Sequence, residues 1–151
     1  MVLLEQSDRA EARGHTPLAR WLGSAAATCP PRSPGRLPGP DAAGPLRALA
    51  DGLLRDHGRT VEDLGVVLPS PAEHPAITKF CAGLGRPVVD TSLRMGRHPA
   101  DGAVRVAIGA LLLADPSFAI DPARTMTQGN LVLIVTIARG GALRLSLLER
   151  L

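Results

Sequence analysis

The sequence predicts an α/β fold in which helices pack against a mixed β-sheet. Two observations carry this prediction. Up to about residue 114, apolar runs of strand length alternate with segments whose apolar residues recur at helical spacing. The chain then closes with two strand-like runs, 131–138 and 142–149, which Gly140 and Gly141 join. So short a connection makes these two strands antiparallel neighbours.

The predicted strands are short apolar runs, most of them dominated by Val, Leu and Ile. The second run is a weaker strand pattern because it is rich in Ala. In chain order the runs cover 1–4, 17–27, 64–68, 87–91, 131–138 and 142–149. We expect a mixed sheet of about five strands, part of it parallel, because helical segments separate the earlier runs.

The predicted helices lie between those strands. They cover 5–14, 46–58, 72–85 and 102–114. Gly14 and Gly58 close the first two and the third stops at Gly83 or Gly85, since glycine suits a left-handed cap. The fourth, GAVRVAIGALLLA, is apolar nearly all round, which indicates a helix buried on several sides. The Pro- and Gly-rich segment 29–45 is expected to hold neither a helix nor a central strand, and to be a surface loop or a locally disordered one.

The composition suits one domain with an aliphatic core. The chain has 151 residues, 45% of them hydrophobic, and we expect a single domain over 1–151. With two Phe, one Trp and no Tyr, it has little material for stacking on nucleobases. Its net charge of +3 comes from scattered arginines. This distribution indicates solubility and argues against a nucleic-acid partner.

The two cysteines, Cys29 and Cys81, show neither metal-ligand spacing nor a disulfide framework. We expect free thiols in a reducing compartment, and no metal or cofactor. No stretch reaches the roughly 18 apolar residues that span a bilayer. The segment 1–14 is too short and too acidic for a secretory signal. The sequence therefore predicts a cytoplasmic protein without a membrane partner.

In order and approximate spacing, these segments resemble the C-terminal half of the β-ketoacyl synthases, the thiolase-fold condensing enzymes of fatty acid and polyketide synthesis. LLEQSDRAEARG is similar to the family's strand and helix closed by Ala-Arg-Gly, and GPLRALADGLLRDHGRTVEDLGVV to its helix, turn and strand before a catalytic His. RPVVDTSLRMGRHPADGAVRVAIGALLLA resembles its Lys and Gly-His segment with the long helix that follows. LVLIVTIARGGALRLSLLERL resembles its final hairpin. The resemblance implies the C-terminal half of a thiolase-like fold.

The resemblance also implies acyl-transfer chemistry, from which this chain departs. In the family, a cysteine nucleophile carries the acyl group, and two imidazoles stabilise the thioester oxyanion and assist decarboxylation. That nucleophile belongs to the N-terminal half, and neither Cys29 nor Cys81 matches its setting. Where the first imidazole is expected, the chain has Leu68, Pro69 or Ser70.

The second imidazole has one candidate, His98, which lies one residue late. Arg97 directly follows Gly96, and Ser92 or Arg94 takes the place of the family's Lys. Arginine stays charged and cannot replace the proton exchange of a Lys or His near neutral pH. His98 is therefore the best candidate for a retained catalytic residue.

His74 is the other candidate imidazole. It follows Glu73, which matches an acidic residue that the family carries at the start of its next helix, so the resemblance makes Glu73 a candidate catalytic residue as well. His74 is either a displaced catalytic imidazole or, more simply, an exposed histidine at a helix start. In the final hairpin, Arg139 replaces the family's Phe, and a guanidinium there would be costly in an acyl tunnel unless it had a partner or the tunnel were absent.

These departures leave three functions open, and whether the chain is an enzyme stays open with them. It is a non-catalytic subunit, chain length factor-like or truncated, that works with a ketosynthase subunit and an acyl carrier protein. Alternatively, it is a split condensing enzyme, an acyltransferase, that uses His98 or His74 with a Cys-bearing partner. The third alternative is a non-functional gene remnant. A lone half would expose the apolar sides of 102–114, so we expect a hetero- or homo-oligomer.

Overall fold

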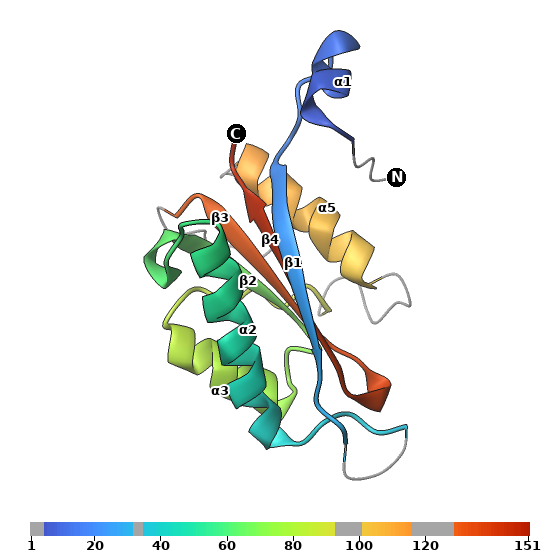
Figure 1. Ribbon diagram of the computed structural model, residues 1–151, viewed down its shortest axis with the longest axis vertical. Helices are drawn as coiled ribbons and strands as arrows, with labels where there is room; N and C mark the ends of the chain where they lie inside the picture. Colours follow the sequence, from blue (N-terminus) through green and yellow to red (C-terminus); the bar gives the residue numbers. More distant parts are fainter. Residues whose placement is uncertain (1–4, 32–34, 93–100, 116–128) are drawn as a thin grey trace.

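The structure is a computed structural model of the chain, and it describes residues 5–31, 35–92, 101–115 and 129–151 (Figure 1). Its strands form one sheet in the order β1-β4-β3-β2. β2 and β3 are parallel, and the other neighbours are antiparallel, so the sheet is mixed as predicted. The strands are β1 Arg20–Thr28, β2 Leu64–Ser70, β3 Leu131–Ile137 and β4 Ala142–Glu149.

Helices cover both faces of this sheet. Figure 1 shows α2 and α3 on one face, α5 on the other, and α1 beyond the start of β1. Gly58 and Gly85 follow α2 and α3 with φ values of 62° and 63°, which confirms the predicted glycine caps. The helices are α1 Ser7–Ala12, α2 Ala43–Asp56, α3 Pro75–Leu84 and α5 Asp101–Ala114, with short 3-10 turns at Pro40–Ala42, Val61–Asp63 and Arg139–Gly141.

The central strands separate two apolar layers. Along β3, alternate residues point to opposite faces of the sheet. Leu131, Leu133 and Val135 belong to the cluster under α2 and α3, whereas Val132 and Ile134 belong to the cluster under α5. All five are buried. This two-sided burial explains why the strand reads as one continuous apolar run.

The closing hairpin confirms the antiparallel pair predicted from the Gly-Gly connection. Gly140 and Gly141 adopt φ values of 80° and 91°. The amide of Gly140 donates to the carbonyl of Arg36 at 3.1 Å, and the carbonyl of Gly141 accepts from the amide of Cys29 at 2.8 Å. A Cβ atom on Gly141 would overlap the Cys29 carbonyl group. The turn therefore needs glycine both for its backbone conformation and for this close contact.

Among the described residues, the sheet has four strands where about five were expected. The predicted strand 87–91 forms only an isolated bridge between Val88 and Val67. The amide of Val67 donates to the Pro87 carbonyl at 2.9 Å, and the amide of Val89 donates to the Val67 carbonyl at 3.0 Å. The next β2 residue facing this edge is Pro69, which has no amide hydrogen to continue the ladder. The predicted strand 1–4 lies outside the described residues.

The Pro- and Gly-rich segment also differs from its prediction. Its last residues form the 3-10 turn Pro40–Ala42 and the first turn of α2, which begins at Ala43. Pro45 fits in this turn because the amides of a first helical turn have no intrahelical acceptor. The prediction of a loop without helix up to residue 45 was therefore wrong.

Helix α5 is less enclosed than its apolar sequence predicted. Ile108, Gly109 and Leu112 face the sheet and are buried. A Cβ atom on Gly109 would come within 2.9 Å of Leu148 Cδ1, so the helix lies close to β4. Leu111, on the outer side, is 38% exposed, so the expected burial on several sides was wrong in the described chain. The sequence also predicted that apolar sides of 102–114 would be exposed in the absence of another half of the fold. The outer side of α5, which includes Leu111, is indeed exposed.

Candidate functional site

The candidate site is the C-terminal end of β2, where the resemblance places the first imidazole. Leu68 is fully buried in the cluster under α5. The carbonyl oxygen of Pro69 accepts a hydrogen bond from Nε of Arg105 at 3.0 Å. Ser70 is 9% exposed and Arg105 is fully buried. A hydroxyl and a guanidinium group therefore occupy this end of the sheet.

The turn after residue 89 supplies the next group near this end of the sheet. Asp90 Oδ1 accepts hydrogen bonds from the Ser92 amide at 2.8 Å and from the Ser92 hydroxyl at 2.6 Å. Ser92 was one of two residues aligned with the family's Lys. Its hydroxyl fixes the local turn. The other aligned residue, Arg94, lies outside the described residues.

His74 is the N-cap residue of α3. Its Nδ1 accepts a hydrogen bond from the Ala76 amide at 3.2 Å, and its Nε2 lies 3.0 Å from the Pro38 carbonyl oxygen. Because a carbonyl only accepts and an amide N–H only donates, the ring is the neutral Nε2–H tautomer. His74 is 8% exposed, so its interpretation as an exposed histidine was wrong, although its place at a helix start was right. Its ring fastens α3 to the segment before α2.

The other two residues of the predicted catalytic set are Glu73 and His98. Glu73 lies exposed at the surface directly before His74, whose ring is turned into the protein. His98 lies outside the described residues. Of the predicted catalytic set, the structure thus describes Glu73 at the surface and His74 in a buried position.

Both cysteines are free thiols, as predicted. Cys81 lies on α3 in the cluster between the helices and the sheet, and burial raises the pKa of its thiol from 9.0 to about 11. A thiol with so high a pKa carries very little thiolate at neutral pH, so it is a poor nucleophile. Cys29 is half-buried beside the Gly140–Gly141 corner.

Arg139 lies exposed at that corner. The Arg139 guanidinium therefore reaches solvent. The desolvation cost that was expected for this charge inside an acyl tunnel does not arise at this position in the described chain.

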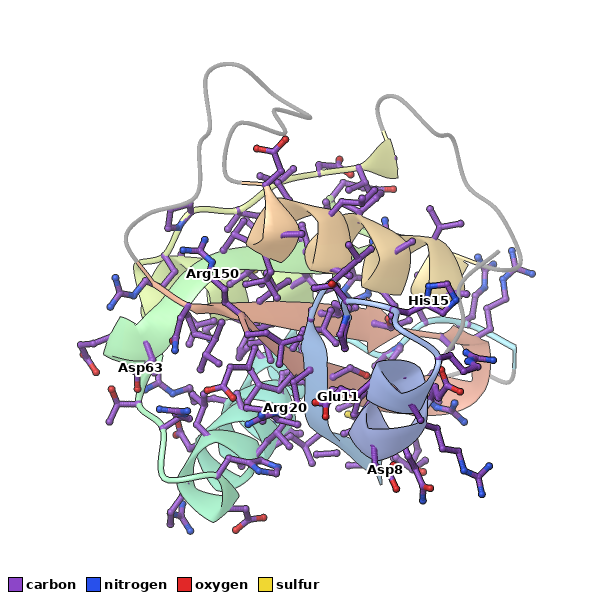
Figure 2. The ribbon with its side chains drawn as sticks, turned by 90° about the horizontal axis from the view of Figure 1, so that it is seen from above. Asp8, Glu11, His15, Arg20, Asp63 and Arg150 are labelled. Carbon is purple, nitrogen blue, oxygen red and sulfur yellow. The ribbon has the colours of Figure 1, made fainter. Side chains whose placement is uncertain are left out.

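An apolar groove of about 710 Å³ lies between α1, the start of β1 and α5. It includes all four large hydrophobic side chains found exposed in the described chain, namely Leu18, Trp21, Leu111 and Leu151. Figure 2 shows His15 and Arg20, which also line the groove, on the segment that leads from α1 into the sheet. The groove is therefore the main exposed apolar surface of the described chain.

No three His, Cys, Asp or Glu residues within the described ranges are placed to hold a metal ion. Across the same ranges, no helix combines the length and apolarity that a membrane crossing requires.

No family model matches the sequence, and no curated protein does. Solved structures do match. A β-ketoacyl synthase from Burkholderia phymatum STM815 has a TM-score of 0.79 at 16% identity, over 97% of this chain and 41% of that one. The ishigamide ketosynthase/chain length factor has a TM-score of 0.75 at 16% identity, over 96% and 41%. The AntDE:AntF complex, a type II PKS acyl-carrier protein with its ketosynthase bound to the hexaketide, has a TM-score of 0.75 at 13% identity, over 97% and 42%.

A human mitochondrial 3-ketoacyl-CoA thiolase also matches, with a TM-score of 0.58 at 17% identity, over 96% of this chain and 33% of that one. The chain has a thiolase-like fold. This confirms the predicted fold class, with four strands in the described part of the chain in place of about five. The chain spans less than half the length of each of these structures.

Arg105 is a residue of this thiolase-like fold that sequence reasoning missed. It is the largest fully buried side chain among the residues that the structure describes. A signal was present, because Arg105 precedes Ile108 by three residues and Leu112 by seven, so all three share one helical face. A charge on the face that meets the sheet indicates a buried, hydrogen-bonded group.

Glu149 is the second missed residue. It ends β4, is 6% exposed, and forms ion pairs with Arg59 and, at 3.5 Å, with Arg20. It continues the alternation of Leu143, Leu145 and Leu147, all buried in the cluster under α2 and α3. That alternation places its carboxylate on an inner face, where a charge needs a partner.

Proposed function

We propose that this chain is a non-catalytic, ketosynthase-like subunit of the chain length factor type, which works in polyketide or fatty acid assembly beside a Cys-bearing ketosynthase and an acyl carrier protein. Its fold is that of ketosynthases, one of them a ketosynthase/chain length factor. The observation that carries the proposal is the hydrogen bond from buried Arg105 to the Pro69 carbonyl, at the position where the family's first imidazole is expected.

This hydrogen bond gives the end of β2 a structural task. Decarboxylative condensation needs an imidazole there that stabilises negative charge on the thioester oxygen. The Pro69 carbonyl is an acceptor, so it cannot donate to an oxyanion. Both nitrogens of His74, the nearest histidine in sequence, are already hydrogen-bonded to Ala76 and Pro38. The described residues at this end of β2 therefore support a structural role, in which Arg105 holds α5 against the sheet.

The cysteines support the same proposal. An acyl carrier needs a thiolate, and the pKa of Cys81, about 11, keeps its thiol protonated at neutral pH. Cys29 donates its backbone amide to Gly141 and packs against the same apolar cluster. We therefore place the nucleophile on the partner ketosynthase.

Reconstitution tests the proposal. The purified chain is mixed with a ketosynthase encoded beside it and with malonyl-loaded carrier protein, and the products are compared with those of the ketosynthase alone. We expect product length or rate to change. A double variant, Cys29→Ser with Cys81→Ala, is expected to produce the same change if it is folded, because neither thiol takes part.

The competing functions predict other results. A split enzyme would take an acyl group from a loaded carrier protein, visible as added mass on this chain, and would lose activity on His98→Ala. Either result would overturn the non-catalytic role. A gene remnant would leave the ketosynthase products unchanged at every ratio of the two proteins, and this outcome would also refute the proposal.

A further inference from the structure

We propose that the groove between α1, the start of β1 and α5 binds a free amphiphilic carboxylate, a small molecule with an apolar body and one anionic head. This inference does not depend on the proposed function. Segments far apart in the sequence build the groove, namely α1 with the residues that follow it, the sheet, and the outer side of α5. Its volume of about 710 Å³ lies within the range of about 300–1,000 Å³ that is typical of small-molecule sites.

Small side chains from three elements leave the space that makes this surface concave. Four alanines line it: Ala10 on α1, Ala19 directly before β1, and Ala107 and Ala110 on α5. Trp21 and Leu111 line the same groove, and each is 38% exposed. A ligand whose apolar body covers these two side chains removes their surface from water, which is favourable.

Polar and apolar groups are separated within the groove. Its α5 wall consists of aliphatic residues alone, Val106, Ala107, Ala110 and Leu111. A polar group placed against this wall would lose its contact with water and find no hydrogen-bond partner on these side chains. The part of the ligand that contacts α5 must therefore be apolar, and its polar group must lie toward the opposite wall.

The opposite wall carries an excess of positive charge. Arg13, His15 and Arg20 line the groove, together with a single acid, Glu5. Glu5 forms an ion pair with Arg13, so these two charges cancel. Arg20 remains as a permanent cation at the groove, and exposed His15 adds an imidazole. This wall therefore suits a ligand with an anionic head.

Arg20 has donors available for that head. Its Nη1 lies 3.5 Å from Oε2 of Glu149, whose other oxygen pairs with Arg59. The Arg20 side chain is 57% exposed, whereas that of Arg59 is 35% exposed. A guanidinium carries five N–H donors and binds carboxylates well. Because Arg59 stays with Glu149, a ligand carboxylate can bind Arg20 without leaving Glu149 unpaired.

The ligand is a free molecule and not a lipid surface. A helix that binds a membrane presents one long apolar face outward. Here the apolar groups form the walls of a concave groove, and α1 has only six residues. A small amphiphile fits between these walls, whereas a lipid bilayer does not.

Tryptophan fluorescence tests the inference. Trp21 is the only tryptophan in the sequence and lines the groove, so its emission reports whether the groove is occupied. Titration of the full chain with decanoate, below its micelle concentration, is expected to give a saturable blue shift. Decanol has the same apolar body without the charge, and we expect it to bind about tenfold more weakly. Equal affinities would refute recognition of the head, and no response to decanoate would refute the ligand.

Two pairs of variants locate the site. Arg20→Gln is expected to abolish most of the preference for decanoate over decanol, whereas Arg55→Gln, at an exposed arginine of α2 on the other face of the sheet, should retain it. Ala110→Phe fills the groove and is expected to weaken both ligands by about tenfold or more. Ala48→Phe, at an exposed alanine of α2, should change neither affinity.

Two further measurements complete the test. Circular dichroism verifies the fold of each variant, and calorimetry repeats the titrations without relying on the emission of Trp21. Equal affinities in Ala110→Phe and Ala48→Phe would place binding elsewhere and refute the groove as the site. Shielding of Trp21 by an added ketosynthase, without any response to decanoate, would refute the ligand and leave the proposed function intact.

Discussion

Arg105 of α5 donates a hydrogen bond from Nε to the carbonyl oxygen of Pro69, at 3.0 Å. Pro69 lies two residues after Val67, at the edge of β2 where the bridge to Val88 ends. Its carbonyl points to the same edge as that of Val67, because backbone groups alternate along a strand. Arg105 therefore satisfies the acceptor that a longer fifth strand would have used, and it fastens α5 to the sheet.

Replacing Arg105 by Lys is expected to lower the free energy of unfolding by about 1–3 kcal/mol, because an ammonium group cannot reproduce the directed donors of a buried guanidinium. Urea unfolding measures the difference. Arg144→Lys, at an exposed position of β4, is the matched control and should change stability by less than about 0.5 kcal/mol. Equal losses in the two variants would contradict the role given to Arg105.

Gly141→Ala is expected to destabilise the chain more than Gly140→Ala. Both residues have positive φ values, so each alanine costs about 1–2 kcal/mol in backbone conformation. At Gly140 no atom lies within 4 Å of the new Cβ, whereas at Gly141 it meets the Cys29 carbonyl group. This overlap adds about 1–3 kcal/mol. Thermal unfolding of the two variants measures it, and equal losses would mean that the corner does not depend on this contact.

Most of the fold was predictable because its signals are local. The residues of β3 and β4 read as two strands from their apolar runs, and Gly58 and Gly85 end helices where the sequence predicted. The error at 87–91 has a non-local cause. PVVDT has the composition of a strand, but whether it pairs depends on Pro69, on another strand, whose missing amide ends the ladder. A segment's own pattern does not contain that information.

The candidate site was less predictable for the same reason. The sequence gives His74 a helix-start position, but its burial depends on Pro38, whose carbonyl it contacts across 36 residues of chain. The partners of Glu149 likewise become visible only once Arg20 and Arg59 are placed around the end of β4. The burial of Arg105 could have been predicted from the sequence, because its helical spacing to Ile108 places it on the buried face of α5.

The buried thiol of Cys81 predicts a pH-dependent stability. Burial raises its pKa to about 11, above its usual 9.0, so the folded chain keeps a proton that the unfolded chain releases in between. The free energy of unfolding should therefore fall as pH rises from about 9 to about 11. Urea unfolding under reducing conditions measures this slope. Cys81→Ala should flatten it, whereas Cys29→Ala should retain it, and an unchanged slope in Cys81→Ala would assign it to another group.

His74→Ala is expected to lower the free energy of unfolding by about 1–3 kcal/mol, because it removes the N-cap acceptor for Ala76 and leaves the buried Pro38 carbonyl without its donor. His74→Asn keeps a cap acceptor and should lose less. His15→Ala, at an exposed histidine, is the control and should change stability by less than about 0.5 kcal/mol. Chemical denaturation ranks the three variants. If His74 served catalysis instead, His74→Ala would match His15→Ala in stability and would reduce turnover in the reconstituted ketosynthase reaction.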